Sequence, residues 1–365
     1  MRITRLELRD FRNYEAFDLE PSPGLTVLVG PNAAGKTHVI EAVQLVTAAR
    51  SFRRPRFEEL VRWGAEAARV SLRAEKEERL LETEMTVDAT GQRSYRINGQ
   101  SKRRFSEISG LLPSVLFTPE DLGLVKGPAE RRRAALDDLG EQLSPTYGSL
   151  RRDYGRVVKH RNALLKEGAY GPRMEAWDEQ AVVLGARLVA HRLRLLERVM
   201  SHAARGYQAM AAGETLDFSY ADRCGLFSCD LAQTEQIEAA IRTEMARRHG
   251  EERRRMTTLV GPHRDDVVFM VGGREARSFA SQGQQRTIAL AWKLAEVQVV
   301  REVLRTDPVL LLDDVMSELD AERRAALSEL VSSEIQTLVT TTSTGYFTLE
   351  MLERSTVIGV GEASR

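Results

Sequence analysis

Eight consecutive residues, Gly30-Pro31-Asn32-Ala33-Ala34-Gly35-Lys36-Thr37, fit the pattern G-x-x-x-x-G-K-[ST] at every fixed position. They follow a short apolar run, residues 26–29, that is typical of a buried strand, and they precede residues 38–49, whose apolar side chains recur at helical spacing. A strand, a glycine-rich loop and a helix in this order predict a cradle for the phosphates of a nucleotide. The alternative is a plain glycine-rich turn that opens a helix.

Each part of this loop has a chemical role in nucleotide binding. Gly30 and Gly35 permit backbone conformations that aim N–H groups at phosphate oxygens. Lys36 adds a positive charge near the β and γ phosphates, and Thr37 offers its hydroxyl to Mg²⁺. We therefore expect the cofactors ATP and Mg²⁺, a catalytic contribution from Lys36, and ATP contacts from Gly30, Pro31, Asn32, Ala33, Ala34, Gly35, Lys36 and Thr37.

Composition narrows the class of protein. The 365 residues exceed the usual size of one compact core, so two lobes are expected. The 53 basic and 53 acidic residues balance, which excludes a uniformly basic surface. Cys224 and Cys229 have no companions at zinc spacing, and no apolar run is long enough to cross a membrane. We expect a cytoplasmic protein with no membrane partner.

The pattern along the chain changes twice. Residues 1–108 and 300–365 have α/β character and predict an ATPase lobe made of a mixed sheet with flanking helices. Residues 109–299 are dominated by long charged helical patterns and predict a mainly helical second lobe. These patterns lack the sustained heptads that a long coiled coil requires, so a compact lobe is expected.

A second set of candidate residues follows the apolar run 309–312. Asp313 and Asp314 end this predicted strand, where carboxylates lie beside a phosphate loop at the carboxyl edge of a sheet. We expect Asp313 to hold Mg²⁺ through its water shell and Asp314 to be the catalytic base that orients the attacking water. A buried strand with polar ends is the alternative for this run taken alone.

Two further motifs flank the paired acids. Residues 280–286 resemble an ABC signature motif at the start of an amphipathic helix, so Ser281, Gly283 and Gln284 are candidate ATP contacts. The alternative is a capping box, since a serine followed three residues later by a glutamine is an ordinary helix start. After the acids, residues 317–320 match the D-loop pattern Ser-x-Leu-Asp, which makes Asp320 another candidate.

The order of these four motifs resembles ABC-type ATPases, and more specific runs resemble the RecF family. The resemblance covers nearly the whole chain. The specific runs are Phe11-Arg12-Asn13-Tyr14, Ser51-Phe52-Arg53, FTPEDL at 117–122, KHRNALL at 159–165 and GPHRDD at 261–266.

This resemblance implies a recombination mediator in gap repair and replication restart. It implies a homodimer that sandwiches two ATP molecules, with the signature motif of one subunit completing the site of the other. Arg12 is implied as a nucleotide contact. The implied partners are double-stranded DNA, junctions of single and double strands, and RecR, which acts with RecO to load RecA.

Two departures from the wider ABC pattern predict slow, weak, DNA-stimulated hydrolysis that acts as a switch. Asp314 stands where a longer glutamate is usual, and a displacement of about 1 Å can cost about a hundredfold in rate. No switch histidine follows the run 337–340, where Thr341, Thr342 and Ser343 stand.

Local basic clusters are candidates for DNA backbone contacts, because several phosphates must be bound at once. The clusters without interleaved acids are Arg50, Arg53, Arg54 and Arg56, and Lys102, Arg103 and Arg104. The runs 131–133 and 253–255 have acidic neighbours, so a solvated helix face is the alternative.

The alternative function is an ATP-binding subunit that drives a non-DNA partner such as a transporter. A chromosome tether would need a long heptad arm that this sequence lacks, and a small-molecule kinase would leave the signature-like helix unexplained.

Overall fold

The computed structural model describes residues 2–48, 50–76, 79–102, 110–169, 171–211, 213–222, 224, 233–332 and 335–361. The chain forms two compact units: unit 1 comprises Met1–Gly123 and Ala289–Arg365, and unit 2 comprises Leu124–Ile288. The predicted divisions lay after residue 108 and before residue 300, so they differ from these limits. One reason is that strand β8 (Ser114–Phe117), placed by prediction in the helical lobe, pairs with strand β12 (Val309–Asp313) of unit 1.

The first sheet of unit 1 holds the predicted nucleotide loop. Its strand order is β14-β3-β13-β12-β8, and all neighbours are parallel. The remaining strands are β3 (Leu25–Val29), β13 (Thr337–Thr341) and β14 (Thr356–Gly359). β12 and β13 are buried over their whole length, as expected of central parallel strands covered on both faces.

The second sheet of unit 1 has six antiparallel strands in the order β2-β1-β4-β5-β6-β7. These are β1 (Arg2–Phe11), β2 (Tyr14–Leu19), β4 (Ala67–Lys76), β5 (Arg79–Asp88), β6 (Arg93–Ile97) and β7 (Gln100–Lys102). Helix α1 (Lys36–Ala48) packs against strands of both sheets. Its Val39, Ile40 and Val43 are fully buried, so α1 is the centre of the unit 1 core.

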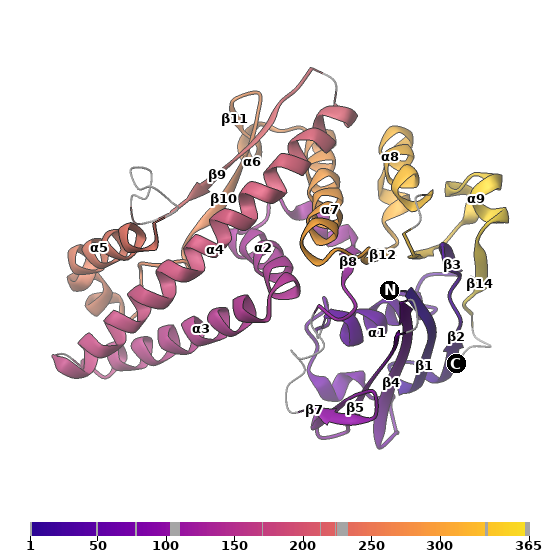
Figure 1. Cartoon of the computed structure of the whole chain (residues 1–365), viewed down its shortest axis with the longest axis horizontal. Helices are drawn as coiled ribbons and strands as arrows, with labels where there is room; N and C mark the ends of the chain where they lie inside the picture. The colour runs from indigo at the N-terminus through magenta and orange to yellow at the C-terminus, as the bar shows by residue number, and fades with distance from the viewer. Residues whose placement is uncertain are drawn as a thin grey trace. The chain divides into compact units, whose positions relative to one another are not determined.

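Unit 2 is mainly helical, as predicted from its periodicity, and adds a small antiparallel sheet in the order β11-β10-β9. Its elements are α2 (Ala129–Leu143), α3 (Pro145–Lys166), α4 (Pro172–Met210), β9 (Leu216–Ala221), α5 (Thr234–Arg255), β10 (Asp266–Val271), β11 (Arg274–Glu275) and α6 (Ala276–Phe279). Figure 1 shows α3 running alongside α4. Helix α4 has 39 residues and is the longest in the described ranges, so they contain no extended coiled-coil arm.

Helix α7 (Gln282–Leu304) begins in unit 2 and ends in unit 1, and β12 follows it. The other short elements of unit 1 are η1 (Phe57–Leu60), η3 (Pro119–Gly123), η5 (Val315–Glu318), α8 (Ala321–Ser332), η6 (Thr344–Tyr346) and α9 (Leu349–Glu353). None of the helices described for this chain combines the length and the apolarity needed to cross a bilayer. The predicted architecture, an α/β head with a mainly helical second lobe, is confirmed.

The parallel register sets the position of the site. Val29 is paired with Thr341, and Asp313 with Thr340. The ends of β3, β12 and β13 therefore meet at one edge of the sheet, which is where residues of ligand sites gather in parallel α/β folds.

Candidate nucleotide site

The glycine-rich loop begins where β3 ends, and its two glycines have no room for a side chain. A Cβ on Gly30 would lie 2.0 Å from the carbonyl oxygen of Val360, which is backbone and cannot move aside. Gly35 has φ +107°, and its Cβ would lie 2.6 Å from Asn13 Nδ2. The Gly30 N–H donates to the Thr341 carbonyl at 3.2 Å, so the loop is tied to β13 at its first residue.

Lys36 lies inside this loop. Its Nζ donates to the carbonyls of Gly30 at 2.7 Å and Pro31 at 2.8 Å, and the residue is 6% exposed. Burial lowers the pKa of its ammonium, while the charges of Asp314 and Asp313 oppose that shift. The protein thus holds the lysine among carbonyl oxygens at the start of α1, where helix N–H groups favour anions.

Thr37 and Asp313 meet as predicted, although 276 residues separate them. The Thr37 hydroxyl donates to Asp313 Oδ1 at 2.9 Å, and the Thr340 hydroxyl donates to the same oxygen at 2.7 Å. Burial raises the pKa of Asp313, and the two hydroxyl hydrogen bonds lower it in part. A hydroxyl and a carboxylate are oxygen ligands of the kind that Mg²⁺ accepts, so the residues present fit this ion.

The described residues include no group of three or more His, Cys, Asp or Glu that could hold a metal ion. Mg²⁺ usually takes one or two carboxylates and keeps water and phosphate oxygens as its other ligands, and Asp313 offers one carboxylate next to the Thr37 hydroxyl.

Asp314 carries two signs of a strained functional residue. Its φ is 53°, in the left-handed region that favours glycine, and its Oδ1 is buried with no hydrogen-bond partner in the described parts of the chain. Burial raises the pKa of its carboxyl group, Lys36 lowers it and Glu318 raises it further. A buried acceptor oxygen with no partner can receive a hydrogen bond from a water molecule, which is what orienting an attacking water requires.

Arg12 faces a carboxylate that sequence reasoning did not include. Its Nε and Nη2 donate to Glu41 Oε2 at 2.9 Å and Oε1 at 2.8 Å, and its Nη1 donates to the Glu59 carbonyl at 2.9 Å. Three of the five N–H donors of the guanidinium are thus engaged. The predicted nucleotide contact has to come from the remaining two.

The signature-like residues form the capping box that was the alternative interpretation. The Gln284 N–H donates to Ser281 Oγ at 3.2 Å, and the Ser281 N–H donates to Gln284 Oε1 at 2.8 Å. The Gln284 side chain also donates to Glu214 at 2.9 Å. Ser281 is exposed, so its capping role leaves the start of α7 open to solvent.

Asp320 caps helix α8. Its Oδ1 accepts from the Arg323 N–H at 3.0 Å, and its carboxylate pairs with the Arg323 side chain. This role is structural in the isolated chain, and a contact to ATP stays a prediction.

The candidate DNA residues separate into different environments. Arg53, Arg54 and Arg56 are exposed in the segment that follows α1. Burial raises the pKa of Asp313 and lowers that of His38; the charge of Arg53 opposes the first shift in part and adds to the second. Arg50 is half-buried in the same segment, Lys102 is half-buried at the end of β7, and Arg103 and Arg104 lie outside the described residues.

The basic run 131–133 contains an arginine with a structural role. Arg132 is 3% exposed, forms a bidentate ion pair with Asp266 at 2.7 and 2.9 Å, and donates to three backbone carbonyls. His263, to which sequence reasoning gave no role, is likewise held in the interior of unit 2 by the Tyr154 hydroxyl, 2.7 Å from its Nδ1.

Sequence reasoning did not identify Asn13 and His38, whose side chains link the turn after β1 to the nucleotide loop and to α1. The Asn13 amide donates to the Ala34 carbonyl at 3.3 Å, and its Oδ1 lies 2.6 Å from His38 Nδ1. Because the Asn13 amide is the donor toward Ala34, its oxygen accepts and His38 Nδ1 carries the proton. The run Phe11-Arg12-Asn13-Tyr14 contained this signal, but only its arginine was interpreted.

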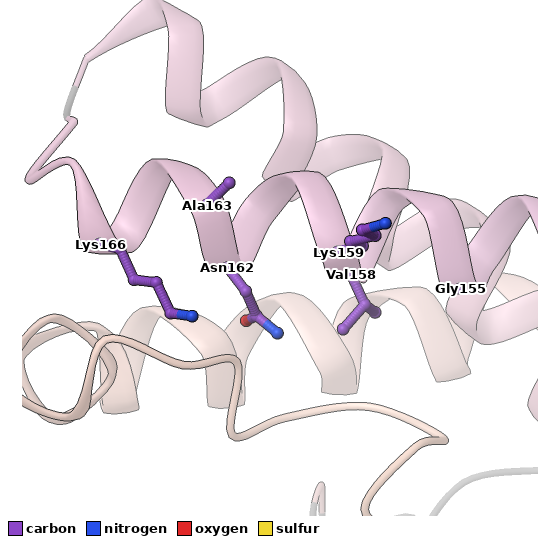
Figure 2. A pocket seen from close by; sticks show the side chains of 6 residues that line it. All are labelled: Gly155, Val158, Lys159, Asn162, Ala163 and Lys166. Atoms are coloured by element: carbon purple, nitrogen blue, oxygen red, sulfur yellow. The ribbon is translucent and has the colours of Figure 1, made fainter.

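A groove in unit 2 contains none of the predicted site residues. It lies along α3 and is lined by Gly155, Val158, Lys159, Asn162, Ala163 and Lys166. Figure 2 shows the side chains of Asn162 and Lys166 on the side of α3 that faces a neighbouring loop. Asn162 Oδ1 accepts from the Thr258 N–H at 2.7 Å, so this asparagine is engaged in internal packing.

Comparison with known proteins gives consistent results. The model of the RecF/RecN/SMC N terminal domain matches residues 2–362. The DNA replication and repair protein RecF of Synechococcus sp. (strain JA-3-3Ab) is 41% identical over 366 residues, covering 99% of this chain and 96% of that protein. RecF of Symbiobacterium thermophilum is 40% identical, covering 94% and 92%.

Solved structures agree at the level of the fold. The structure of the recombination mediator protein RecF-ATPrS in the RecFOR pathway superimposes with a TM-score of 0.89 at 29% identity, covering 95% of this chain and 94% of that one. An SmcHead bound to the C-winged helix domain of ScpA superimposes with a TM-score of 0.55 at 17% identity, covering 98% and 94%, which shows a shared fold only.

Proposed function

This chain belongs to the RecF family, and from that premise we propose that it is an ATP-dependent DNA-binding mediator of gap repair and replication restart. The observation that carries the proposal is the meeting of Thr37 with Asp313 beside Lys36 and Asp314 at one sheet edge. Solved relatives described with ATP and with ATPrS support ATP as the nucleotide.

In this proposal, different residues of unit 1 bind ATP and promote its hydrolysis. The backbone N–H groups of the loop and the Lys36 ammonium bind phosphate oxygens, and the Asn13 contact keeps the loop in shape. Thr37 and Asp313 hold Mg²⁺, which supplies charge neutralisation on the phosphates. Asp314 orients the attacking water, and its short side chain makes hydrolysis slow, which suits a switch.

A second copy of the chain completes each site in this proposal. Its exposed Ser281, together with Gly283, Gln284 and Asp320, contacts the ATP bound by the first copy. Since the same surfaces meet twice, the result is a two-fold symmetric dimer that closes when ATP binds and opens after hydrolysis.

The proposed ligand of the closed dimer is DNA. Arg53, Arg54 and Arg56 are exposed cations with no acid interleaved among them, as suits contacts to the duplex backbone. Double-stranded DNA and its junctions with single strands are the proposed sites. RecR is the proposed direct partner, with RecO and RecA in the same pathway, and the name of the solved relative supports membership of that pathway.

The test is fluorescence anisotropy of a labelled gapped duplex at fixed salt, with the protein in Mg-ATP or Mg-ADP. We expect tight binding with ATP only. The variant Ser281→Arg places a bulky cation at the proposed dimer surface and should lose this binding while still binding ATP. Equal affinity in all three conditions would exclude the clamp and favour an ATPase that drives a protein partner such as a transporter.

A further inference from the structure

Glu41 is a buried carboxylate on the nucleotide-loop helix that no predicted site included. It is 0% exposed and lies within α1, which begins at Lys36. Its oxygens accept three hydrogen bonds: two from Arg12, at 2.8 and 2.9 Å, and one from the Ser51 hydroxyl, at 2.5 Å. A buried carboxylate needs such partners, because an uncompensated buried charge is strongly destabilising.

These three hydrogen bonds join segments that are distant in the chain. Arg12 belongs to the turn between β1 and β2, Glu41 to α1, and Ser51 to the segment that carries the exposed arginines. Figure 1 shows α1 beside β4 in unit 1. Glu41 is therefore shared between a candidate nucleotide contact and a candidate DNA contact segment.

The basic segment is attached to α1 at a second point. Gln44, 5% exposed and one turn beyond Glu41, accepts the Phe52 N–H at 2.7 Å through its Oε1. The Ser51 Oγ, besides donating to Glu41, accepts the Arg53 N–H at 3.1 Å. The start of the segment 51–56 thus takes its conformation from side chains of the nucleotide-loop helix.

We propose that Glu41 is a positioning residue that orients Arg12 toward bound nucleotide and, through Ser51, couples nucleotide binding to the conformation of the basic segment 51–56. The inference rests on the proposed ATP-dependent DNA binding. When an anion accepts hydrogen bonds from the two remaining N–H donors of Arg12, the guanidinium interacts with two anions at once and its contact with Glu41 weakens. Glu41 then accepts a stronger hydrogen bond from Ser51. ATP therefore orders the segment that meets DNA.

The decisive variant is Ser51→Ala in the full-length chain, because it removes the link between Glu41 and the segment and leaves both Arg12 contacts intact. Hydrogen exchange of a peptide spanning 51–57 is measured with and without ATP, together with ATP affinity and DNA affinity. In the native protein we expect ATP to increase protection of this peptide. In Ser51→Ala we expect that increase to vanish and ATP affinity to stay within about twofold.

The ratio of DNA affinities in ATP and in ADP is the functional readout. Coupling between two ligands usually spans about 5-fold to 150-fold, and Ser51→Ala should bring the ratio close to one. Ser51→Thr, which keeps a hydroxyl, should restore both the protection and the ratio. A merely structural serine would lower stability without changing the ratio.

The matched control is Thr47→Val on the same helix. Thr47 is also fully buried, and its hydroxyl bonds the Val43 carbonyl at 2.9 Å and the Ser114 hydroxyl at 2.8 Å, away from the basic segment. It should lower stability and leave the ratio unchanged.

The results distinguish a failure of the proposed function from a failure of the proposed coupling through Glu41. A native protein that binds DNA equally in ATP and ADP refutes the proposed function. A native protein with ATP-dependent binding that Ser51→Ala fully retains, or that Thr47→Val abolishes equally, refutes the coupling through Glu41.

Discussion

At the residue scale, we predict that Asp314 determines whether the site hydrolyses ATP or only binds it. Asp314→Asn keeps the size of the side chain and removes the acceptor charge that orients water. We expect hydrolysis to fall at least about a hundredfold, the usual order for losing a positioned base. ATP binding should persist, because a negative charge near the phosphates is also removed. Single-turnover hydrolysis and equilibrium nucleotide binding test this, and undiminished hydrolysis would exclude Asp314 as the water-orienting group.

The acid groups of the site also predict a pH dependence of catalysis. Burial raises the pKa of Asp314 and of Asp313 above the ordinary value of 3.8. Because the ionised form of Asp314 is the acceptor, the rate should fall with decreasing pH at a higher pH than an ordinary aspartate would give. A pH profile of single-turnover hydrolysis at saturating ATP measures this limb, and a profile flat down to pH 4 would contradict it.

His263 predicts a pH dependence of stability. Burial lowers its pKa from 6.5 to about 4, so the unfolded chain binds more protons than the folded chain between these values. The contribution of His263 to the free energy of unfolding should therefore be completely present above pH 6.5 and should be lost as the pH drops toward 4. Urea unfolding at pH 7 and pH 5 measures this loss. His263→Gln should show a smaller difference between the two pH values than the native protein.

At the scale of elements, the contact between the nucleotide loop and β14 constrains Gly30. A methyl group there would lie 2.0 Å from the Val360 carbonyl oxygen, so Gly30→Ala must displace either the loop or the end of β14. We expect a loss of about 1 to 3 kcal/mol, the usual cost of overpacking, together with weaker ATP binding. Chemical denaturation and nucleotide titration measure both.

Gly24→Ala is the matched control, since its added Cβ would meet only Ser22 Oγ at 4.0 Å. It should change stability by no more than about 0.5 kcal/mol. A Gly30→Ala variant as stable as this control would show that the loop has room for a side chain.

The elements also show how far sequence reasoning reaches. Long helices were predictable because apolar residues recur over several turns: the amphipathic helix expected to start within residues 280–286 is α7 (Gln282–Leu304), and the strand expected at 309–312 is β12 (Val309–Asp313). Strands β8 and β14 have only four residues each, too few for a period to emerge. The missed β8 accounts for part of the misplaced division between the units.

The candidate site divides in the same way. Lys36 and Thr37 were identified because phosphate binding requires these residue types at set positions of the loop. Asp313 was identified because it ends an apolar run typical of a buried strand. Asn13, Glu41 and Ser51 were not assigned, since each acts through a contact to a residue far along the chain that only the fold brings near. Whether Ser281 contacts ATP could not be judged from its spacing, which suits a capping box equally well.

At the scale of the whole molecule, DNA affinity should depend on salt through a few local cations, because the chain has no net charge. Each phosphate that the protein binds adds about 0.9 to the slope of log affinity against log salt. Replacing Arg53, Arg54 and Arg56 together by glutamine should reduce this slope by about 0.9 for every phosphate that the variant no longer binds. The same change at Arg253, Arg254 and Arg255 removes an equal charge from an exposed helix end and should leave the slope nearly unchanged. Equal effects of the two triple variants would place the DNA surface elsewhere.

The parallel sheet of unit 1 has a consequence for biogenesis. Strand β3, which leads into the nucleotide loop, is translated long before its two neighbours, β13 (Thr337–Thr341) and β14 (Thr356–Gly359). The first residue of the loop is tied to Thr341, and Val360 donates to Val29 at 2.7 Å. A ribosome-bound chain therefore carries an unfinished loop until β13 and β14 have also been translated. We expect chains that stop before β13 to lack a formed nucleotide loop and to bind no ATP.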